Sequence, residues 1–171
     1  MVIWIVGLSG SGKTSIGREV YSLWKEKAPN TALVDGDEIR EVFGARGEAD
    51  YSVEGRERNS NRVAALCAWL DRQGINVVCC ILSIFEDRRK KNRAGYSSYF
   101  EVFVDTPFPV ILQRDTKGLY APAMRGEIKN VVGVDIPFTP PAAADLRIDN
   151  SADKTSYRDD AALILAKAGV M

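Results

Sequence analysis

The sequence predicts an α/β fold of three layers, in which a five-stranded parallel sheet lies between helices. Three observations lead to this fold class. Apolar runs of strand length alternate with helical stripes along the chain, a glycine-rich loop joins the first apolar run to the first helical stripe, and no repeat, linker or low-complexity stretch interrupts the order. We therefore expect a single domain over residues 1–171.

The expected elements follow in a regular order. Strands are expected at residues 2–6, 31–34, 75–82, 100–104 and 146–148, because each is an apolar run. Helices are expected after residue 14 up to Pro29, from near Ser52 to Gly74, from residue 107 to about 114, and over residues 156–168. Residues 116–141 combine glycine, proline and mixed charge without a period, and such a long irregular connection is typical of a mobile lid.

The glycine-rich loop at residues 7–14 completes the pattern G-x-x-x-x-G-K-[ST]. Its glycines let backbone N–H groups and the start of the next helix point at one phosphate group. In this pattern Lys13 reaches the β- and γ-phosphates and Thr14 ligates Mg²⁺. A plain Gly/Ser turn is the alternative, and the strand before the loop and the helix after it argue against that alternative. The residues expected to bind the nucleotide phosphates are Gly7, Ser9, Gly10, Ser11, Gly12, Lys13, Thr14 and Ser15.

The composition excludes several classes of function. The chain has 23 basic and 23 acidic residues, so it offers no overall attraction to nucleic acid or to a membrane surface. The apolar run at residues 77–82 is too short to span a bilayer, and the N-terminus lacks the charged-then-apolar order of a signal peptide. We therefore expect a cytoplasmic protein whose partners are small nucleotides, with no nucleic-acid or membrane partner.

Cysteine and histidine usage limits the chemistry further. Cys67, Cys79 and Cys80 lie in apolar runs without metal-ligand spacing, and we expect them to be reduced core residues. The chain contains no histidine, which excludes histidine triads and histidine metal sites. Proton transfer therefore falls to carboxylates or to the substrate itself.

Two carboxylates follow the second expected strand. Asp35 and Asp37 leave its carboxyl end, where ligands bind in open parallel sheets. There they can hold Mg²⁺ or accept a proton from an attacking hydroxyl, and Arg40 lies one helical turn further on, suited to an anionic substrate. The alternative is that these aspartates cap the next helix. Capping and catalysis are compatible for one of them.

Two later segments carry cations. On a helix that begins near Ser52, Arg56 and Asn59 share a face, although a solvated helix start explains the same residues. At the expected lid, Arg114 and Lys117 are placed to meet a transferring phosphoryl group, and a solvated loop is the alternative.

Taken together, these segments resemble the adenylylsulfate (APS) kinase family over residues 2–150. The motifs that carry the likeness appear in the family's order as GLSGSGKT from Gly7, DGD-x-x-R from Asp35, Ser-x-x-x-Arg-x-x-Asn-x-x-Arg from Ser52, Phe-Val-Asp-Thr-Pro from Phe103, Arg-Asp-x-Lys-Gly-Leu-Tyr from Arg114, Gly-Glu-Ile-Lys-Asn from Gly126 and Gly-Val-Asp from Gly133. The resemblance implies a P-loop nucleotide-kinase fold. It also implies transfer of the γ-phosphate of ATP to the 3′-hydroxyl of APS, with Mg²⁺, to give 3′-phosphoadenylylsulfate.

The resemblance implies roles for individual residues. Asp35 and Asp37 would work at the metal and the 3′-hydroxyl, and Ser83 matches a serine described in the family as a phosphoserine intermediate. Direct in-line transfer needs no covalent step, so a substrate contact suits Ser83 better. With the loop included, the predicted catalytic residues are Lys13, Asp35, Asp37 and Ser83, the metal ligands are Thr14 and Asp35, and the further nucleotide-binding residues are Arg114 and Lys117. Acceptor binding is assigned to Asp37, Arg40, Tyr51, Arg56, Asn59, Leu82, Ser83, Lys117, Gly118, Leu119 and Val131.

The acceptor side departs from the family pattern. Tyr51 is one candidate for the two rings that stack on the APS adenine, but Val131 stands where the other ring, a phenylalanine, is expected. The lost ring costs roughly 1 kcal/mol of stacking. The change resembles the APS-kinase-like proteins of bacterial capsule and surface-polysaccharide pathways, some of which phosphorylate cytidine diphosphoramidate.

The sequence therefore leaves several functions open. APS is the leading acceptor and a cytidine nucleotide is the alternative. A regulatory P-loop NTPase and a catalytically silent binding module are the options from other classes. The oligomeric state stays open, a homodimer included.

Overall fold

The computed structural model describes residues 1–45 and 47–170 and confirms the predicted α/β fold. Five strands form one sheet in the order β2-β3-β1-β4-β5, and every pairing between neighbours is parallel. The strands are β1 (Val2–Val6), β2 (Thr31–Asp35), β3 (Asn76–Ile81), β4 (Tyr99–Asp105) and β5 (Leu146–Asp149). Each lies within a residue or so of a predicted apolar run, because a strand covered on both faces is apolar along its length.

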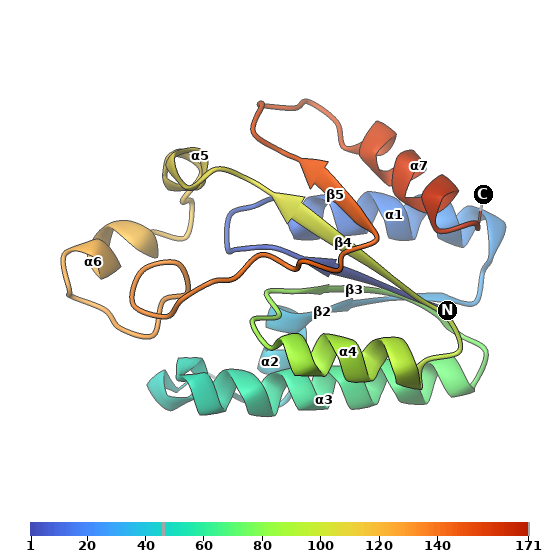
Figure 1. Cartoon of the computed structure of the whole chain (residues 1–171), viewed down its shortest axis with the longest axis horizontal. Helices are drawn as coiled ribbons and strands as arrows, with labels where there is room; N and C mark the ends of the chain where they lie inside the picture. Colours follow the sequence, from blue (N-terminus) through green and yellow to red (C-terminus); the bar gives the residue numbers. More distant parts are fainter. Residues whose placement is uncertain (46, 171) are drawn as a thin grey trace.

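Helices cover both faces of this sheet (Figure 1). One face carries α1 (Lys13–Lys27) and α7 (Arg158–Lys167), and the other carries α2 (Gly36–Val42), α3 (Val53–Arg72) and α4 (Glu86–Gly95). A 3-10 helix, η1 (Glu48–Tyr51), precedes α3. The short helices α5 (Phe108–Gln113) and α6 (Tyr120–Met124) lie beyond the carboxyl ends of the strands, so that end of the sheet is the enclosed one.

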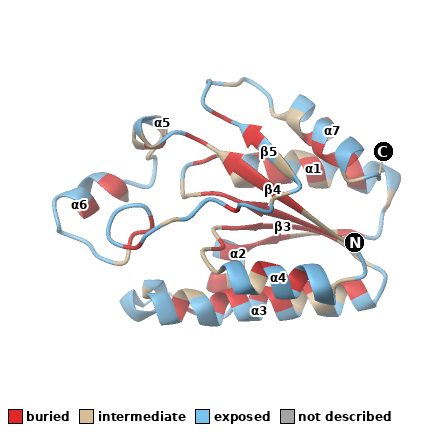
Figure 2. Cartoon of the chain, in the orientation of Figure 1, coloured by how far each residue is buried: buried red, intermediate tan, exposed pale blue. Residues whose placement is uncertain are grey.

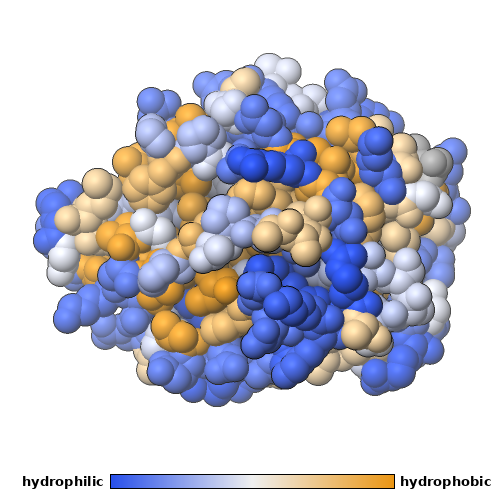
Figure 3. Space-filling model, in the orientation of Figure 1, coloured by the Kyte–Doolittle hydropathy of each residue, from blue (hydrophilic) through white to orange (hydrophobic). Residues whose placement is uncertain are grey.

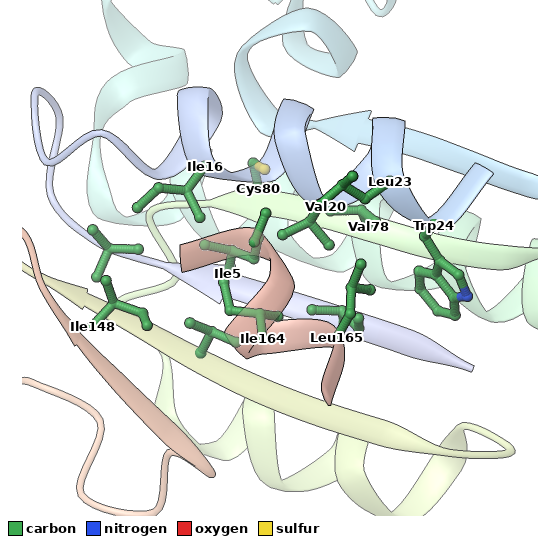
Figure 4. Packing of buried hydrophobic residues seen from close by; sticks show 14 residues of the cluster. Ile5, Ile16, Val20, Leu23, Trp24, Val78, Cys80, Ile148, Ile164 and Leu165 are labelled. Carbon is green, nitrogen blue, oxygen red and sulfur yellow. The ribbon is translucent and has the colours of Figure 1, made fainter. Parts of the chain in front are cut away.

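The core consists of an apolar cluster on each face of the sheet, and the central strand β1 contributes to both. Ile3 and Ile5 pack toward α1 and α7, whereas Val2, Trp4 and Val6 pack toward α3. Figure 4 shows the first cluster from close by, and Figure 2 shows that β1, β3 and β4 are buried along most of their length. The side chains alternate because successive residues of a strand point to opposite faces.

The cysteines belong to this core, as predicted. Cys67, Cys79 and Cys80 are free and buried. A Cβ atom at Gly17 of α1 would lie 2.1 Å from the Cys80 sulfur, so glycine lets α1 approach β3 closely. Burial raises the pKa of the Cys80 thiol to about 12, which keeps the thiol protonated and unreactive near neutral pH.

Helix α4 was not predicted, because it has no apolar stripe. Its buried residues are Arg89 and Asn92, and the Arg89 guanidinium pairs with buried Glu101 of β4 at 3.4 Å. The molecular surface over α4 is accordingly hydrophilic (Figure 3). Hydrophobic periodicity cannot detect a helix that is anchored by a buried ion pair.

The segment predicted as an irregular lid contains more order than expected. It includes α6 and a parallel bridge between Val132 and Ile136. Tyr120 and Val131 are buried against Ile111 of α5. The expectation that residues 116–141 lack regular structure was therefore wrong, and whether the segment moves stays a prediction. Within the described ranges, no helix combines the length and apolar character needed to cross a bilayer.

Candidate active site

A cavity of about 660 Å³ lies at the carboxyl ends of the strands. A cleft in this place is typical of ligand sites in open parallel sheets. The sequence-predicted site residues that line it are Ser9, Lys13, Asp35, Asp37, Arg40, Tyr51, Arg56, Asn59, Leu82, Lys117, Leu119 and Val131. The structure thus gathers residues from five separate segments of the sequence into one enclosure.

The phosphate loop joins β1 to α1 beside this cavity. Gly10 and Gly12 have φ angles of 78° and 90°, which favour glycine because a side chain is strained there. Gly7, Ser11, Thr14 and Ser15 belong to the same loop and first helical turn. A chain that bends in this way exposes its N–H groups on the inner side of the bend, so the loop fits the phosphates of a nucleotide.

Lys13 begins α1 and reaches over the loop. Its Nζ donates a hydrogen bond to the Leu8 carbonyl at 3.3 Å. Desolvation lowers the pKa of Lys13, and the nearby carboxylates of Asp37 and Asp35 oppose that shift. Burial removes water from the Lys13 ammonium. The negative oxygens of a transferring phosphoryl group can take the place of that water.

Asp35 faces the loop and caps a helix at the same time. The Thr14 hydroxyl donates to Asp35 Oδ2 at 2.8 Å, and the Asp37 backbone N–H donates to Asp35 Oδ1 at 2.8 Å, at the start of α2. The capping interpretation of Asp35 is therefore confirmed, and its role at the metal or the acceptor hydroxyl stays a prediction. The hydroxyl and carboxylate oxygens of Thr14 and Asp35 fit Mg²⁺, which takes few protein ligands beside phosphate and water. No larger group of metal-binding side chains occurs among the described residues.

An ion pair crosses the cavity from α2 to the segment before α6. Lys117 Nζ lies 2.9 Å from Asp37 Oδ2, and the two side chains are 64% and 68% exposed. Desolvation raises the pKa of Asp37, but the hydrogen bond and charge of Lys117 outweigh it, so the pKa of Asp37 falls below its ordinary value. Such an exposed pair adds little stability and is easily exchanged for other partners.

Two arginines from different helices surround Tyr51. The Cζ atoms of Arg40 and Arg56 lie 4.7 and 5.8 Å from the centre of the Tyr51 ring. Arg40 donates to the Asp50 carbonyl, and Arg56 donates to the Asn130 carbonyl at 2.7 Å.

These arginines still have hydrogen-bonding capacity to spare. Arg40 Nε, Arg56 Nε and Asn59 Oδ1 are buried without hydrogen-bond partners among the described residues. Buried donors without partners are costly. This end of the cavity is therefore suited to an anionic group.

Val131 lines the cavity from its apolar side. It is 2% exposed and packs with Tyr120, and the Asp135 carboxylate holds its backbone N–H at 2.6 Å. Gly118 has a φ of 60°, which the turn before Leu119 requires. Tyr51 and Val131 both line the cavity, and their contact with an acceptor base stays a prediction.

Ser83 and Arg114 do not line the cavity. Ser83 is 4% exposed, its Oγ accepts a hydrogen bond from the Trp4 indole at 3.3 Å, and Leu82 rather than Ser83 faces the cavity. Arg114 donates to the carbonyls of Asn150 and Ala152 at 2.8 Å each. The predicted roles of Ser83 and Arg114 stay predictions.

Sequence reasoning missed three side chains that support the loop. The Tyr120 hydroxyl donates to the Ser9 carbonyl at 2.9 Å, and Thr106 and Asn150 both donate to the Ser11 carbonyl. Thr106 and Asn150 directly follow β4 and β5. The available signal was their position, since polar residues at the carboxyl ends of parallel strands meet at one edge.

The chain was compared with known protein families, curated proteins and solved structures. The model of the adenylylsulphate kinase family matches residues 1–149. The chain is 39% identical to the cytidine diphosphoramidate kinase of Campylobacter jejuni over 97% of this chain and 95% of that protein. It is 36% identical to the adenylyl-sulfate kinase of Chloroflexus aurantiacus over 86% of this chain and 78% of that protein.

A solved structure is similar over nearly its whole length. This is the Mycobacterium tuberculosis APS kinase CysC in complex with AMPPNP and APS, with a TM-score of 0.85, 31% identity, and coverage of 98% of this chain and 96% of that chain. The family model and the solved structure agree on the family and the fold. The chain therefore belongs to the adenylylsulfate kinase family and is a kinase with the P-loop fold.

Proposed function

We propose that this chain transfers the γ-phosphoryl group of ATP to the 3′-hydroxyl of cytidine diphosphoramidate. The observation that carries the proposal is the shared cavity, in which Lys13 of the phosphate loop and the unpartnered nitrogens of Arg40 and Arg56 face one enclosure. A nucleotide with a second anionic group can span these two charged ends. Its sugar hydroxyl then lies between them.

The nucleotide side of the cavity provides charge stabilisation. Lys13 neutralises charge on the transferring phosphoryl oxygens, and the loop N–H groups hold the remaining phosphates. Bound at Thr14 and Asp35, Mg²⁺ would neutralise charge on the β- and γ-phosphates. Asp37 orients the attacking hydroxyl. Because its pKa is low, Asp37 is a weak base, which suffices for a transition state with little bond formation to the nucleophile.

The base end of the cavity supports a cytidine acceptor. Tyr51 offers one ring and Val131 offers none, so adenine loses much of the advantage that its larger face gives it over cytosine. The Campylobacter jejuni kinase named for cytidine diphosphoramidate also matches this chain over nearly the full length of both proteins. On these two points we propose the cytidine nucleotide ahead of APS, which is the leading acceptor from the sequence alone.

APS is the second candidate acceptor. The solved structure with APS has a TM-score of 0.85 to this chain, and Tyr51 can still stack on one face of an adenine. Both acceptors are anionic nucleotides, so Arg40 and Arg56 serve either one.

The acceptor is tested with Val131→Phe. We expect the wild type to prefer cytidine diphosphoramidate, and the new ring to raise kcat/KM for APS by roughly 2- to 10-fold while crowding the smaller base. The measurement is kcat/KM for both acceptors in a coupled ADP-release assay. Val134→Phe is the control, because Val134 is 37% exposed and does not line the cavity. A wild-type preference for APS, increased further by the ring, would contradict the cytidine assignment.

A second test concerns the proposed lid. We expect residues 116–130 to exchange amide hydrogens faster in the free protein than with AMPPNP and acceptor together, because the exposed Lys117–Asp37 pair is weak and bound phosphate offers Lys117 a better partner. Hydrogen exchange followed by mass spectrometry measures this, with β1 as the internal control. Equal protection with and without ligands would contradict closure.

A further inference from the structure

The Ser11 carbonyl of the phosphate loop receives two side-chain hydrogen bonds from outside the motif. Thr106 Oγ1 donates to it at 3.0 Å and Asn150 Nδ2 donates to it at 2.8 Å. The two donors are 95 and 139 residues away in sequence, so only the folded sheet brings them together. We call this arrangement the Ser11 clamp.

The two donors of the clamp are buried, and the backbone of Asn150 is held by hydrogen bonds. Asn150 is 0% exposed, its backbone N–H donates to the Asp105 carbonyl at 2.8 Å, and its carbonyl accepts from Arg114. A Cβ atom at Gly12 would lie 2.5 Å from Asn150 Nδ2, so the loop closes directly onto this side chain. Thr106 is also buried, at 7% exposure.

Stability alone does not explain Asn150. Its Oδ1 atom is buried without a hydrogen-bond partner in the part of the chain that the structure describes. An unpartnered buried acceptor lowers the free energy of unfolding. Among the described residues, the hydrogen bond of the Asn150 side chain goes to the Ser11 carbonyl, which points to a role in the shape of the loop.

We propose that Thr106 and Asn150 are positioning residues for the nucleotide phosphates. In a trans peptide the C=O and N–H groups point in opposite directions, and no described peptide bond is cis. By holding the Ser11 carbonyl outward, the clamp turns the Gly12 N–H to the opposite side, which we assign to phosphate. The loop is then fixed before the nucleotide binds, so binding loses less conformational freedom. The inference rests on the proposed function only in that ATP occupies the loop.

The test measures the affinity for AMPPNP with Mg²⁺ by isothermal titration calorimetry, with no acceptor present. Thr106→Val keeps the shape of the side chain and removes the hydroxyl, Asn150→Ala removes the amide, and Thr106→Ser is the control that keeps a hydroxyl. We expect each single loss to weaken binding by about 5-fold, because the other donor still holds the carbonyl, and the double variant by more than about 25-fold. Thr106→Ser should bind like the wild type, and KM for the acceptor should not change.

Two results would overturn the clamp. One is unchanged AMPPNP affinity in the double variant, and the other is an equal loss in Thr106→Val and Thr106→Ser. If the double variant does not fold, the AMPPNP affinities of Thr106→Val and Thr106→Ser alone test the clamp. Turnover tests the proposed function separately. A wild type that binds AMPPNP but phosphorylates neither acceptor would contradict that function, and the effect of the clamp on AMPPNP affinity could still be measured.

Discussion

Replacing Lys13 with alanine is expected to lower kcat by about 100-fold or more while the fold stays intact. Lys13 lines the cavity, and its Nζ contacts the loop through the Leu8 carbonyl at 3.3 Å. The ammonium meets charge that develops in the transition state, so its loss acts on kcat more than on the binding of ATP. Desolvation also lowers the pKa of Lys13, so removing the ammonium is not expected to destabilise the fold.

The measurement compares kcat, KM for ATP and the melting temperature with those of the wild type. Lys27→Ala is the control, because Lys27 is an exposed lysine at the other end of the same helix. Lys27→Ala should keep wild-type kinetics. Near-normal turnover by Lys13→Ala would rule out the kinase mechanism.

The fold and the centre of the site could be predicted from the sequence because they depend on local patterns. The apolar runs of β1 and β3 mark buried strands, and the loop of residues 7–14 has a fixed spacing. Parallel topology then brings Asp35 and Thr14 to the same edge of the sheet, because Asp35 ends β2 and the phosphate loop before Thr14 leaves the end of β1.

The remainder depends on contacts between residues far apart in the sequence. Helix α4 is held by the Arg89–Glu101 ion pair, which leaves no trace in hydrophobic periodicity. The Ser11 clamp needs donors from the ends of two other strands. For Ser83 the family likeness implies a catalytic or substrate contact, and in the structure its hydroxyl accepts a hydrogen bond from the Trp4 indole, so that role stays a prediction.

Substitutions at Asp35 and Asp37 are expected to distinguish helix capping from catalysis, because the two side chains make different contacts. Asp35 accepts from both the Thr14 hydroxyl and the Asp37 N–H, whereas Asp37 pairs with Lys117 across the cavity. Asp35→Asn should therefore lower both the melting temperature and the rate. Asp37→Asn should affect the rate alone, because its side chain is 68% exposed and supports no buried structure.

We expect Asp37→Asn to lower kcat by about 100-fold with less than about a 3-fold change in KM for ATP, since the lost carboxylate orients the attacking hydroxyl in the transition state. Glu38→Gln is the matched control, because Glu38 is the next residue of α2 and pairs with Arg18 away from the cavity.

The pH profile gives a second measurement. Desolvation raises the pKa of Asp37, but the hydrogen bond and charge of Lys117 outweigh desolvation, so the pKa is lowered. Asp37 is therefore ionised above this lowered pKa, and it loses its charge only as the pH falls through it.

The pH profile of kcat/KM reports the free enzyme, in which Lys117 pairs with Asp37. In the wild type it should therefore show no carboxylate titration between about pH 6 and pH 8, and its acidic limb should lie below the ordinary aspartate pKa of about 3.9. In Lys117→Ala the acidic limb should move to higher pH, because the group that lowers the Asp37 pKa is gone. Two results would contradict a role for Asp37 in the transfer. One is an acidic limb that stays in place in Lys117→Ala, and the other is a kcat for Asp37→Asn equal to that of Glu38→Gln. Either result would leave Asp35 as the carboxylate on which the reaction depends.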